Sequence, residues 1–192
     1  PADCVLAGIH QVMKDNAPDL VLSGVNRGNN AAENVLYSGT IGAAMEAALQ
    51  GVPAIALSQF YGPENNKLDN PFEASAAFGA DTVRRLLRQG DWESETYRTF
   101  YIVTYPPSPA AEVKGHKVAK MGWRAETSFG VEPHMSPSGR MFMWVKGGPQ
   151  HHKTGPDTDV TANLEGYISV TPLRADMTAH DQLEALAGQI DD

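Results

Sequence analysis

Three consecutive residues, Ser38, Gly39 and Thr40, have the types and the position expected of a phosphate-binding segment. They precede an apolar pattern of helical period, so the free backbone N–H groups and the positive dipole end of a helix would face the preceding loop. Two hydroxyls and a glycine at such a point can hold phosphate oxygens. A plain Ser or Thr N-cap explains the same residues equally well on local sequence, and one hydroxyl can do both.

The loop before these residues is rich in Asn and Gly. Gly24 and Gly28 carry no Cβ and would let the backbone approach a ligand, so we assign them to a substrate loop. Asn26 follows a strand-like apolar run, and its amide oxygen is a neutral ligand of the kind that hard cations accept. Taken alone, Asn26 is more simply a turn residue bonded to its own backbone. Asn30 and Asn34 are weaker candidates for holding this loop or touching a substrate.

Alternating strand and helix patterns surround the loop. Apolar runs predict strands at 19–25, 54–57 and 100–105, and helical spacing predicts helices at 1–13, 41–49 and 70–87. The first strand is continuously apolar, which is typical of burial on both faces in a parallel sheet. The sequence therefore predicts an α/β fold with a Rossmann-like, mainly parallel sheet and flanking helices. Sheets of this kind bind ligands at the carboxyl ends of their strands.

The pattern changes near residue 109. Strand-like stretches separated by Gly-, Pro- and His-rich turns follow at 118–123, 141–145 and 166–173. Thr178 is the predicted cap of a last helix that ends at Ile190. A β-rich extension with a C-terminal helix is therefore expected after the α/β part.

We expect two regions packed as one domain. Residues 1–108 would form the α/β core that carries the active-site loop, and residues 109–192 would form the extension, with a role in oligomerisation. Three aromatic residues of the extension could cover a substrate base or be buried between subunits, and we favour the second role: Trp123, Phe142 and Trp144.

Composition narrows the class of protein. The 192 residues are 42% hydrophobic and 20% charged, as in an ordinary globular domain. No apolar run approaches the roughly 18–20 residues of a membrane span, and a net charge of -8 argues against a large nucleic-acid interface. The single cysteine, Cys4, excludes an internal disulfide and favours a small buried residue in a reducing compartment. We therefore expect a cytoplasmic protein without a membrane or nucleic-acid polymer as partner.

Two segments around the loop, SGVNRGNN at 23–30 and LYSGTIGAAME at 36–46, resemble the SurE family, the stationary-phase survival proteins that act as nucleotidases. Further matches follow in order along the chain: PADCV at the start, GVPAIALS at 51–58, Thr158-Asp159, GYISVTPL at 166–173 and Asp176-Met177-Thr178. An ordered set that covers nearly the whole chain is highly specific. One departure is the strand at 102–106, which lacks the asparagines of the family's N-x-N-x-P pattern.

The resemblance implies a metal-dependent phosphomonoesterase that hydrolyses nucleoside 5′- and 3′-monophosphates, and also short polyphosphate. It implies one Mg²⁺ or Mn²⁺ per subunit, with Asn26 as a ligand and a catalytic residue, and with phosphate held at residues 38–40. It also implies a homodimer or homotetramer formed through residues 110–192.

Family members open with a strand ending in Asn-Asp-Asp-Gly, whose aspartates bind the metal, and this sequence does not contain that segment. One neutral Asn and a few hydroxyls hold Mg²⁺ or Mn²⁺ weakly. The alternative is therefore a chain that binds nucleotide or phosphate without turnover. A further alternative is an assembly fragment that only oligomerises.

Other polar residues of the extension have simpler explanations. The adjacent imidazoles His151 and His152 are predicted to be solvated rather than to bind metal. Asp157 and Asp159, in a Gly-Pro-Asp-Thr-Asp segment, are predicted to be turn residues.

Overall fold

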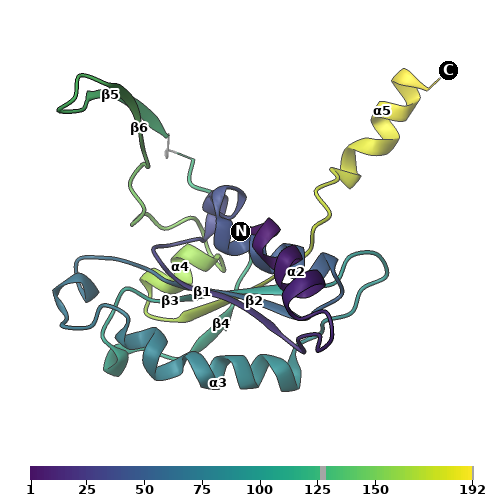
Figure 1. Cartoon of the computed structure of the whole chain (residues 1–192), viewed down its shortest axis with the longest axis horizontal. Helices are drawn as coiled ribbons and strands as arrows, with labels where there is room; N and C mark the ends of the chain where they lie inside the picture. Colours follow the sequence, from purple (N-terminus) through teal and green to yellow (C-terminus); the bar gives the residue numbers. More distant parts are fainter. Residues whose placement is uncertain (126–128, 192) are drawn as a thin grey trace.

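The computed structural model of the chain, which describes residues 1–125 and 129–191, has a five-stranded sheet with helices on both faces (Figure 1). Across the sheet the strands are β1 (Val21–Arg27), β2 (Ala54–Gln59), β3 (Phe100–Tyr105), β7 (Ile168–Leu173) and β4 (His116–Val118). β1, β2 and β3 run parallel, β7 runs antiparallel to β3, and β4 runs parallel to β7. The predicted α/β fold with a mainly parallel sheet is confirmed.

Two long helices cover opposite faces of this sheet, α2 (Gly39–Leu49) and α3 (Glu73–Gln89) (Figure 1). The other helical segments are short: α1 (Ala2–Ala7), the π-helix η1 (Gly8–Val12), α4 (Asp159–Leu164), α5 (Leu183–Ile190) and the 3-10 turns η2 (Ala32–Tyr37), η3 (Asn65–Lys67), η4 (Ala110–Glu112) and η5 (His180–Gln182). Because η2 leads directly into α2, the loop after β1 is anchored on the helix that covers one face of the sheet.

Alternation along the central strands divides the core into two layers, because successive side chains of a strand point to opposite faces. On β2, Ala54 and Ala56 pack with α2, while Ile55 and Leu57 belong to the layer under α3. The small alanines on β2 and on α2 allow helix and sheet to approach closely. All side chains of β2 and β3 are buried, so these strands form a rigid base for the loops that follow them.

A hairpin and the last helix project from the body on the side of α2 (Figure 1). The hairpin pairs β5 (Gly130–Met135) with β6 (Met141–Lys146), and every residue of both strands is exposed. By contrast, β4 and β7, which also come from the second half of the chain, complete the central sheet. The division of the chain at residue 108 stays a prediction.

Two expectations about burial are wrong. β1 is an edge strand with Leu22 48% exposed, because β2 pairs with one side of it and its faces are only partly covered. Cys4 is exposed, because α1 packs mainly on α2 and none of its residues is buried.

Several element boundaries also differ from the sequence prediction. α3 begins at Glu73, because Asn70 Oδ1 accepts the N–H of Phe72 in a turn instead of capping the helix. The strand predicted at 118–123 ends at Val118, and only Lys120 makes a further bridge, to Thr158. Thr178 does not cap the last helix, since its own N–H is bound by Asp176 Oδ1 and the chain passes through η5 before α5.

The part of the chain that the structure describes contains no helix long and apolar enough to cross a membrane.

Candidate active site at the carboxyl edge of the sheet

A pocket of about 420 Å³ lies where the loop after β1 meets the start of α2. Its wall is formed by residues that follow β1 and β2 and by two segments of the second half: Gly28, Asn29, Asn30, Asn34, Tyr37, Ser38, Phe60, Tyr61, Phe129, Gln150 and His151. Since β1 and β2 are parallel, their carboxyl ends meet at one edge of the sheet. The pocket is therefore at the edge where α/β sheets bind ligands, and its volume suits a small molecule.

A larger cavity of about 600 Å³ lies at the opposite edge, between α3 and the sheet. It is lined by residues from the start of β3 and the end of β7, among them Thr99, Tyr101 and Pro172. No loop that leaves the carboxyl end of β1 or β2 reaches this lining. We therefore place the candidate active site in the smaller pocket.

Ser38 lies in the pocket and caps α2. Its Oγ accepts the N–H of Ile41 at 3.2 Å, and its backbone oxygen accepts the N–H of Gly42. This geometry leaves the hydroxyl hydrogen of Ser38 able to donate to a ligand, so capping and phosphate binding are compatible at this residue.

Gly39 and Thr40 form the first turn of α2 but do not line the pocket. Helix geometry leaves their N–H groups without an intrahelical acceptor. A Cβ on Gly39 would lie 2.6 Å from Cγ of Pro1, so the first residue of the chain packs directly on the start of this helix. A side chain at position 39 would collide with Pro1, so this contact requires glycine.

Asn26 lies near the carboxyl end of β1, half-buried and outside the pocket lining. Its Nδ2 donates to the carbonyl oxygen of Gly28 at 3.2 Å. Gly28 lines the pocket and has φ +131°, a backbone conformation that favours glycine. The Asn26 side-chain nitrogen thus stabilises the turn at Gly28. Its Oδ1 takes no part in that hydrogen bond.

Asn30 and Gly24 hold the loop against β2. Asn30 is buried, lines the pocket, and donates from Nδ2 to the Oγ of Ser58 at 2.8 Å. A Cβ on Gly24 would lie 2.2 Å from the carbonyl oxygen of Leu57, so this glycine permits close approach of β1 to β2. Both residues therefore have a structural role in addition to any contact with substrate.

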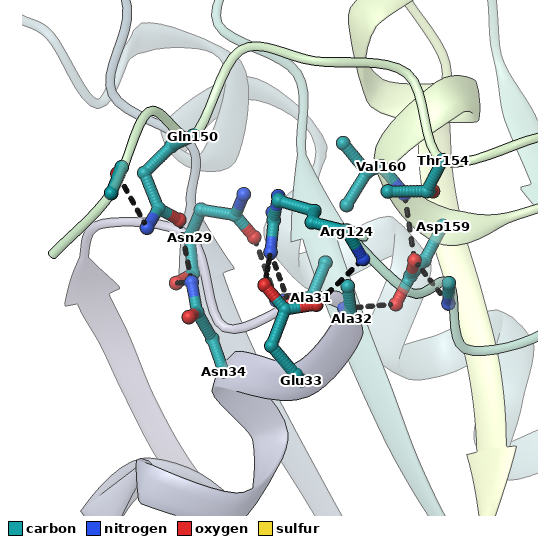
Figure 2. Close-up of polar contacts among 12 residues, drawn as sticks. Asn29, Ala31, Ala32, Glu33, Asn34, Arg124, Gln150, Thr154, Asp159 and Val160 are labelled. Carbon is teal, nitrogen blue, oxygen red and sulfur yellow. Dashed lines mark hydrogen bonds and ion pairs between the residues drawn. The ribbon is translucent and has the colours of Figure 1, made fainter. Parts of the chain in front are cut away.

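A buried carboxylate fastens the loop from the other side (Figure 2). Asp159 Oδ2 accepts the N–H of Ala32 at 2.9 Å, and its Oδ1 accepts those of Gly122 and Val160 at 3.0 and 2.8 Å. Burial raises the pKa of this carboxyl, and the three backbone donors oppose that rise. The prediction of a turn at Asp157 is confirmed by its φ of +59°, but Asp159 begins α4, because its carboxylate joins three segments.

An ion pair adds a second fastening (Figure 2). The Arg124 guanidinium lies 2.9 Å from Glu33 Oε1, and the backbone N–H of Arg124 donates to Glu33 Oε2 at 3.0 Å. The Arg124 side chain is only 1% exposed. η2, which carries Glu33, is therefore tied to the segment that leads toward the hairpin.

The described residues do not by themselves form a metal site. Among residues 1–125 and 129–191, no three His, Cys, Asp or Glu side chains come together as a group that could hold a metal ion. At the pocket edge Asn26 offers one neutral oxygen, whereas Mg²⁺ and Ca²⁺ sites in proteins normally include carboxylates. On its own, this donor set would hold a divalent cation only weakly.

The aromatic side of the pocket was not predicted from the sequence. It is formed by Tyr37, Phe60, Tyr61 and Phe129, with His151 at 4.9 Å from the Phe60 ring. His151 is exposed, as predicted, and lines the pocket. Tyr37 stands directly before the phosphate-binding candidates, and that position is the one sequence signal for this wall. Trp123, Phe142 and Trp144, considered from the sequence as cover for a substrate base or as subunit contacts, are exposed and lie outside the pocket lining.

Fold and pocket together define an α/β protein with a ligand-sized pocket at the carboxyl edge of a parallel sheet. A family model described as "Survival protein SurE" matches residues 1–128. Proteins named 5'-nucleotidase SurE are similar to nearly the whole chain. That of Roseobacter denitrificans is 64% identical over 98% of this chain and 72% of its own length, and that of Cereibacter sphaeroides is 63% identical over 98% and 73%.

A solved structure is similar as well. The crystal structure of the SurE protein from Aquifex aeolicus superposes with a TM-score of 0.73 at 35% identity, covering 98% of this chain and 72% of that one. The chain belongs to the SurE family.

Proposed function

We propose that this chain is a nucleotidase that hydrolyses phosphate monoesters of nucleosides, both 5′- and 3′-monophosphates, and also short polyphosphate. The observation that carries this proposal is the pocket in which the 28–30 loop meets the N-cap of α2, in a chain 64% identical to a protein named 5'-nucleotidase SurE. Because this pocket lies at the ligand-binding edge of the sheet, a phosphorylated small molecule is the natural occupant.

The phosphate group would lie at the start of α2. Ser38 would donate its hydroxyl hydrogen to a phosphate oxygen while Oγ keeps the N–H of Ile41. The unpaired N–H groups of the first turn, at Gly39 and Thr40, would add their partial positive charge. Gly24, Gly28 and Asn30 would keep the substrate loop in place around the ester.

A positive charge lies next to the same pocket. The Arg27 guanidinium is 4.6 Å from the centroid of the Tyr61 ring, and Tyr61 lines the pocket. This stacking holds the cation at the wall without neutralising it. The charge favours an anionic substrate over a neutral nucleoside.

The proposed cofactor is one divalent cation per subunit, Mg²⁺ or Mn²⁺, with Asn26 Oδ1 as one ligand. When bound, such an ion would neutralise phosphoryl oxygens and lower the pKa of a bound water. The remaining oxygen ligands are not supplied by a cluster of acidic residues in the described part of the chain. Binding of the ion therefore needs its own test.

The proposed assembly is a homodimer or homotetramer formed through residues 110–192, in the cytoplasm. Its support is the exposed apolar hairpin: Met141, Phe142, Met143, Trp144 and Val145 are all exposed on β6. Contiguous exposed apolar residues of this kind mark protein–protein contacts. Neither a nucleic-acid polymer nor a membrane is proposed as a partner.

The test of the activity is phosphate release from AMP and GMP, and from 3′-AMP, with EDTA, Mg²⁺ or Mn²⁺ in parallel. We expect release that depends on the added ion and stops with EDTA. Binding of AMP without any release would instead identify a nucleotide-binding protein and overturn the enzyme assignment.

The test of the metal ligand is Asn26→Ala, with the exposed Asn16→Ala as a matched control. Asn26→Ala should lower metal-dependent release and weaken Mn²⁺ binding measured by electron paramagnetic resonance, with little change in thermal unfolding. Asn16→Ala should change none of these. Unchanged Mn²⁺ binding in Asn26→Ala would remove this residue from the metal site.

A further inference from the structure

Two exposed aromatic rings meet at the mouth of the candidate active site. The Tyr37 and Phe129 ring centroids are 4.8 Å apart and tilted by 53°, and both residues line the 420 Å³ pocket. Tyr37 is 71% exposed and Phe129 45% exposed, whereas Phe60, deeper in the same wall, is 1% exposed. Phe60 therefore belongs to the protein core, while the Tyr37 and Phe129 rings line the pocket and are open to solvent.

We propose that Tyr37 and Phe129 form a stacking platform for the base of a nucleoside monophosphate. This inference rests on the proposed function. Aromatic faces exposed beside polar groups bind nucleobases by stacking, because every base has a π-face that can lie on a ring. A platform of this kind accepts purines and pyrimidines alike, since it reads the face of the base and not its edge.

The position of Tyr37 in the chain connects this platform to the phosphate end of the pocket. Tyr37 is bonded to Ser38, the N-cap of α2, so their Cα atoms are about 3.8 Å apart. A ligand with its phosphate at Ser38 would therefore have the Tyr37 ring close by. In a nucleotide one sugar separates the phosphate from the base, so the base could lie on this ring.

Two amide side chains hold the platform together. Asn34 Nδ2 donates to Gln150 Oε1 at 2.5 Å, across 116 residues of sequence, and to the carbonyl oxygen of Asn29 at 3.3 Å (Figure 2). All three residues line the pocket. This contact keeps η2, which carries Tyr37, next to the loop that follows the hairpin.

The experiment compares a substrate with a base and one without. Steady-state hydrolysis of AMP and of ribose 5-phosphate is measured for the parent chain, Tyr37→Ala, Phe129→Ala and Tyr37→Phe. Tyr37→Ala and Phe129→Ala should each raise KM for AMP about tenfold, with kcat and the KM for ribose 5-phosphate unchanged. Tyr37→Phe keeps the ring and should behave as the parent. The exposed Tyr97→Ala, outside the pocket, is the matched control.

The outcomes separate this inference from the proposed function. If the parent hydrolyses both substrates and Tyr37→Ala leaves KM for AMP unchanged, the platform is refuted while the nucleotidase stands. Equal losses on both substrates would overturn it too, because Tyr37 would then only support α2. If the parent hydrolyses neither substrate, calorimetric AMP binding still decides: Tyr37→Ala must weaken Kd about tenfold, or the platform is refuted.

A second copy of the chain is the other occupant to be tested. If the two rings are covered in an oligomer, Tyr37→Ala will change the mass in solution and leave KM and Kd for AMP unchanged. That result would also overturn the platform.

Discussion

Asp159 and Ala32 are 127 positions apart in the sequence, yet the carboxylate of one accepts the backbone N–H of the other at 2.9 Å. Ala32 has φ +54°, a conformation uncommon for a residue with a Cβ. The same carboxylate also accepts the N–H groups of Gly122 and Val160. One side chain of the extension thus fixes the backbone at the start of η2, which leads into the candidate active site.

Loss of this carboxylate should destabilise the fold. Asp159→Ala leaves three buried N–H groups without an acceptor, and we expect the free energy of unfolding to fall by about 3 kcal/mol or more. Asp159→Asn should cost less, because one side-chain oxygen still accepts backbone N–H groups. It should still destabilise the fold, because the amide nitrogen cannot accept the N–H that the second oxygen bound. Urea unfolding followed by circular dichroism measures both.

The matched control is Asp157→Asn, two residues earlier. Asp157 is exposed with φ +59°, and Asn tolerates that conformation. Its unfolding free energy should stay within about 0.5 kcal/mol of the parent. If Asp159→Ala is no less stable than this control, the carboxylate does not fasten the loop.

Removing Glu33 should have a comparable effect for a different reason. Glu33→Ala removes the carboxylate that lies 2.9 Å from the buried Arg124 guanidinium, and breaking a buried pair costs about 3–5 kcal/mol. The exposed pair of Glu64 and Lys67, 3.7 Å apart, supplies the control, since Glu64→Ala should cost less than about 1 kcal/mol. Thermal unfolding of the two variants compares them directly. Equal losses would show that burial of Arg124 adds nothing to the pair.

The central strands could be predicted because their apolar side chains are continuous, and the structure buries every residue of β2 and β3. β1 has the same apolar pattern but lies at the edge of the sheet. An apolar run reports the tendency to be buried, not the presence of a neighbouring strand, so its exposure could not be predicted from the sequence.

The candidate site was predictable to the extent that its residues are local. Ser38 stands before a helical pattern, and the structure places it at the N-cap of α2 and in the pocket. The aromatic wall and the carboxylate of Asp159 come from parts of the chain far apart in sequence. Their roles depend on tertiary contacts such as that of Phe129 with Tyr37, and such contacts cannot be predicted from residue spacing.

Substitution of Gly24 should disturb the pairing of β1 with β2. An added Cβ would lie 2.2 Å from the carbonyl oxygen of Leu57, and φ at this position is +125°. Backbone atoms cannot move aside cheaply, so Gly24→Ala should lower the free energy of unfolding by at least 2 kcal/mol, roughly. Hydrogen exchange should show loss of protection along β1.

Gly42→Ala is the control for this change. Gly42 lies within α2, and a Cβ there would meet nothing within 4 Å. This variant should be more stable than the parent by about 0.5–1 kcal/mol, because alanine favours the helix. A Gly24→Ala variant as stable as Gly42→Ala would mean that β1 can shift away from Leu57 without cost.

His116 should make stability depend on pH near neutrality. Its Nε2 lies 2.8 Å from Thr82 Oγ1, whose own hydrogen is donated to the carbonyl oxygen of Phe78, so the imidazole is the donor. Burial, together with the nearby Arg85, lowers the pKa of His116 below its ordinary value of 6.5. Between the two pKa values the unfolded chain binds more protons than the folded one, and the free energy of unfolding therefore falls as the pH drops below about 6.5.

His116→Gln tests this dependence, because the Gln amide can still donate to Thr82 but does not titrate. The difference in unfolding free energy between parent and variant should be constant from about pH 7.5 to 8.5 and should shift in favour of the variant on acidification below about pH 6.5. Urea unfolding at several pH values gives both curves. If the two curves stay parallel through pH 6, neither burial of the His116 ring nor the charge of Arg85 disfavours its protonation in the folded protein.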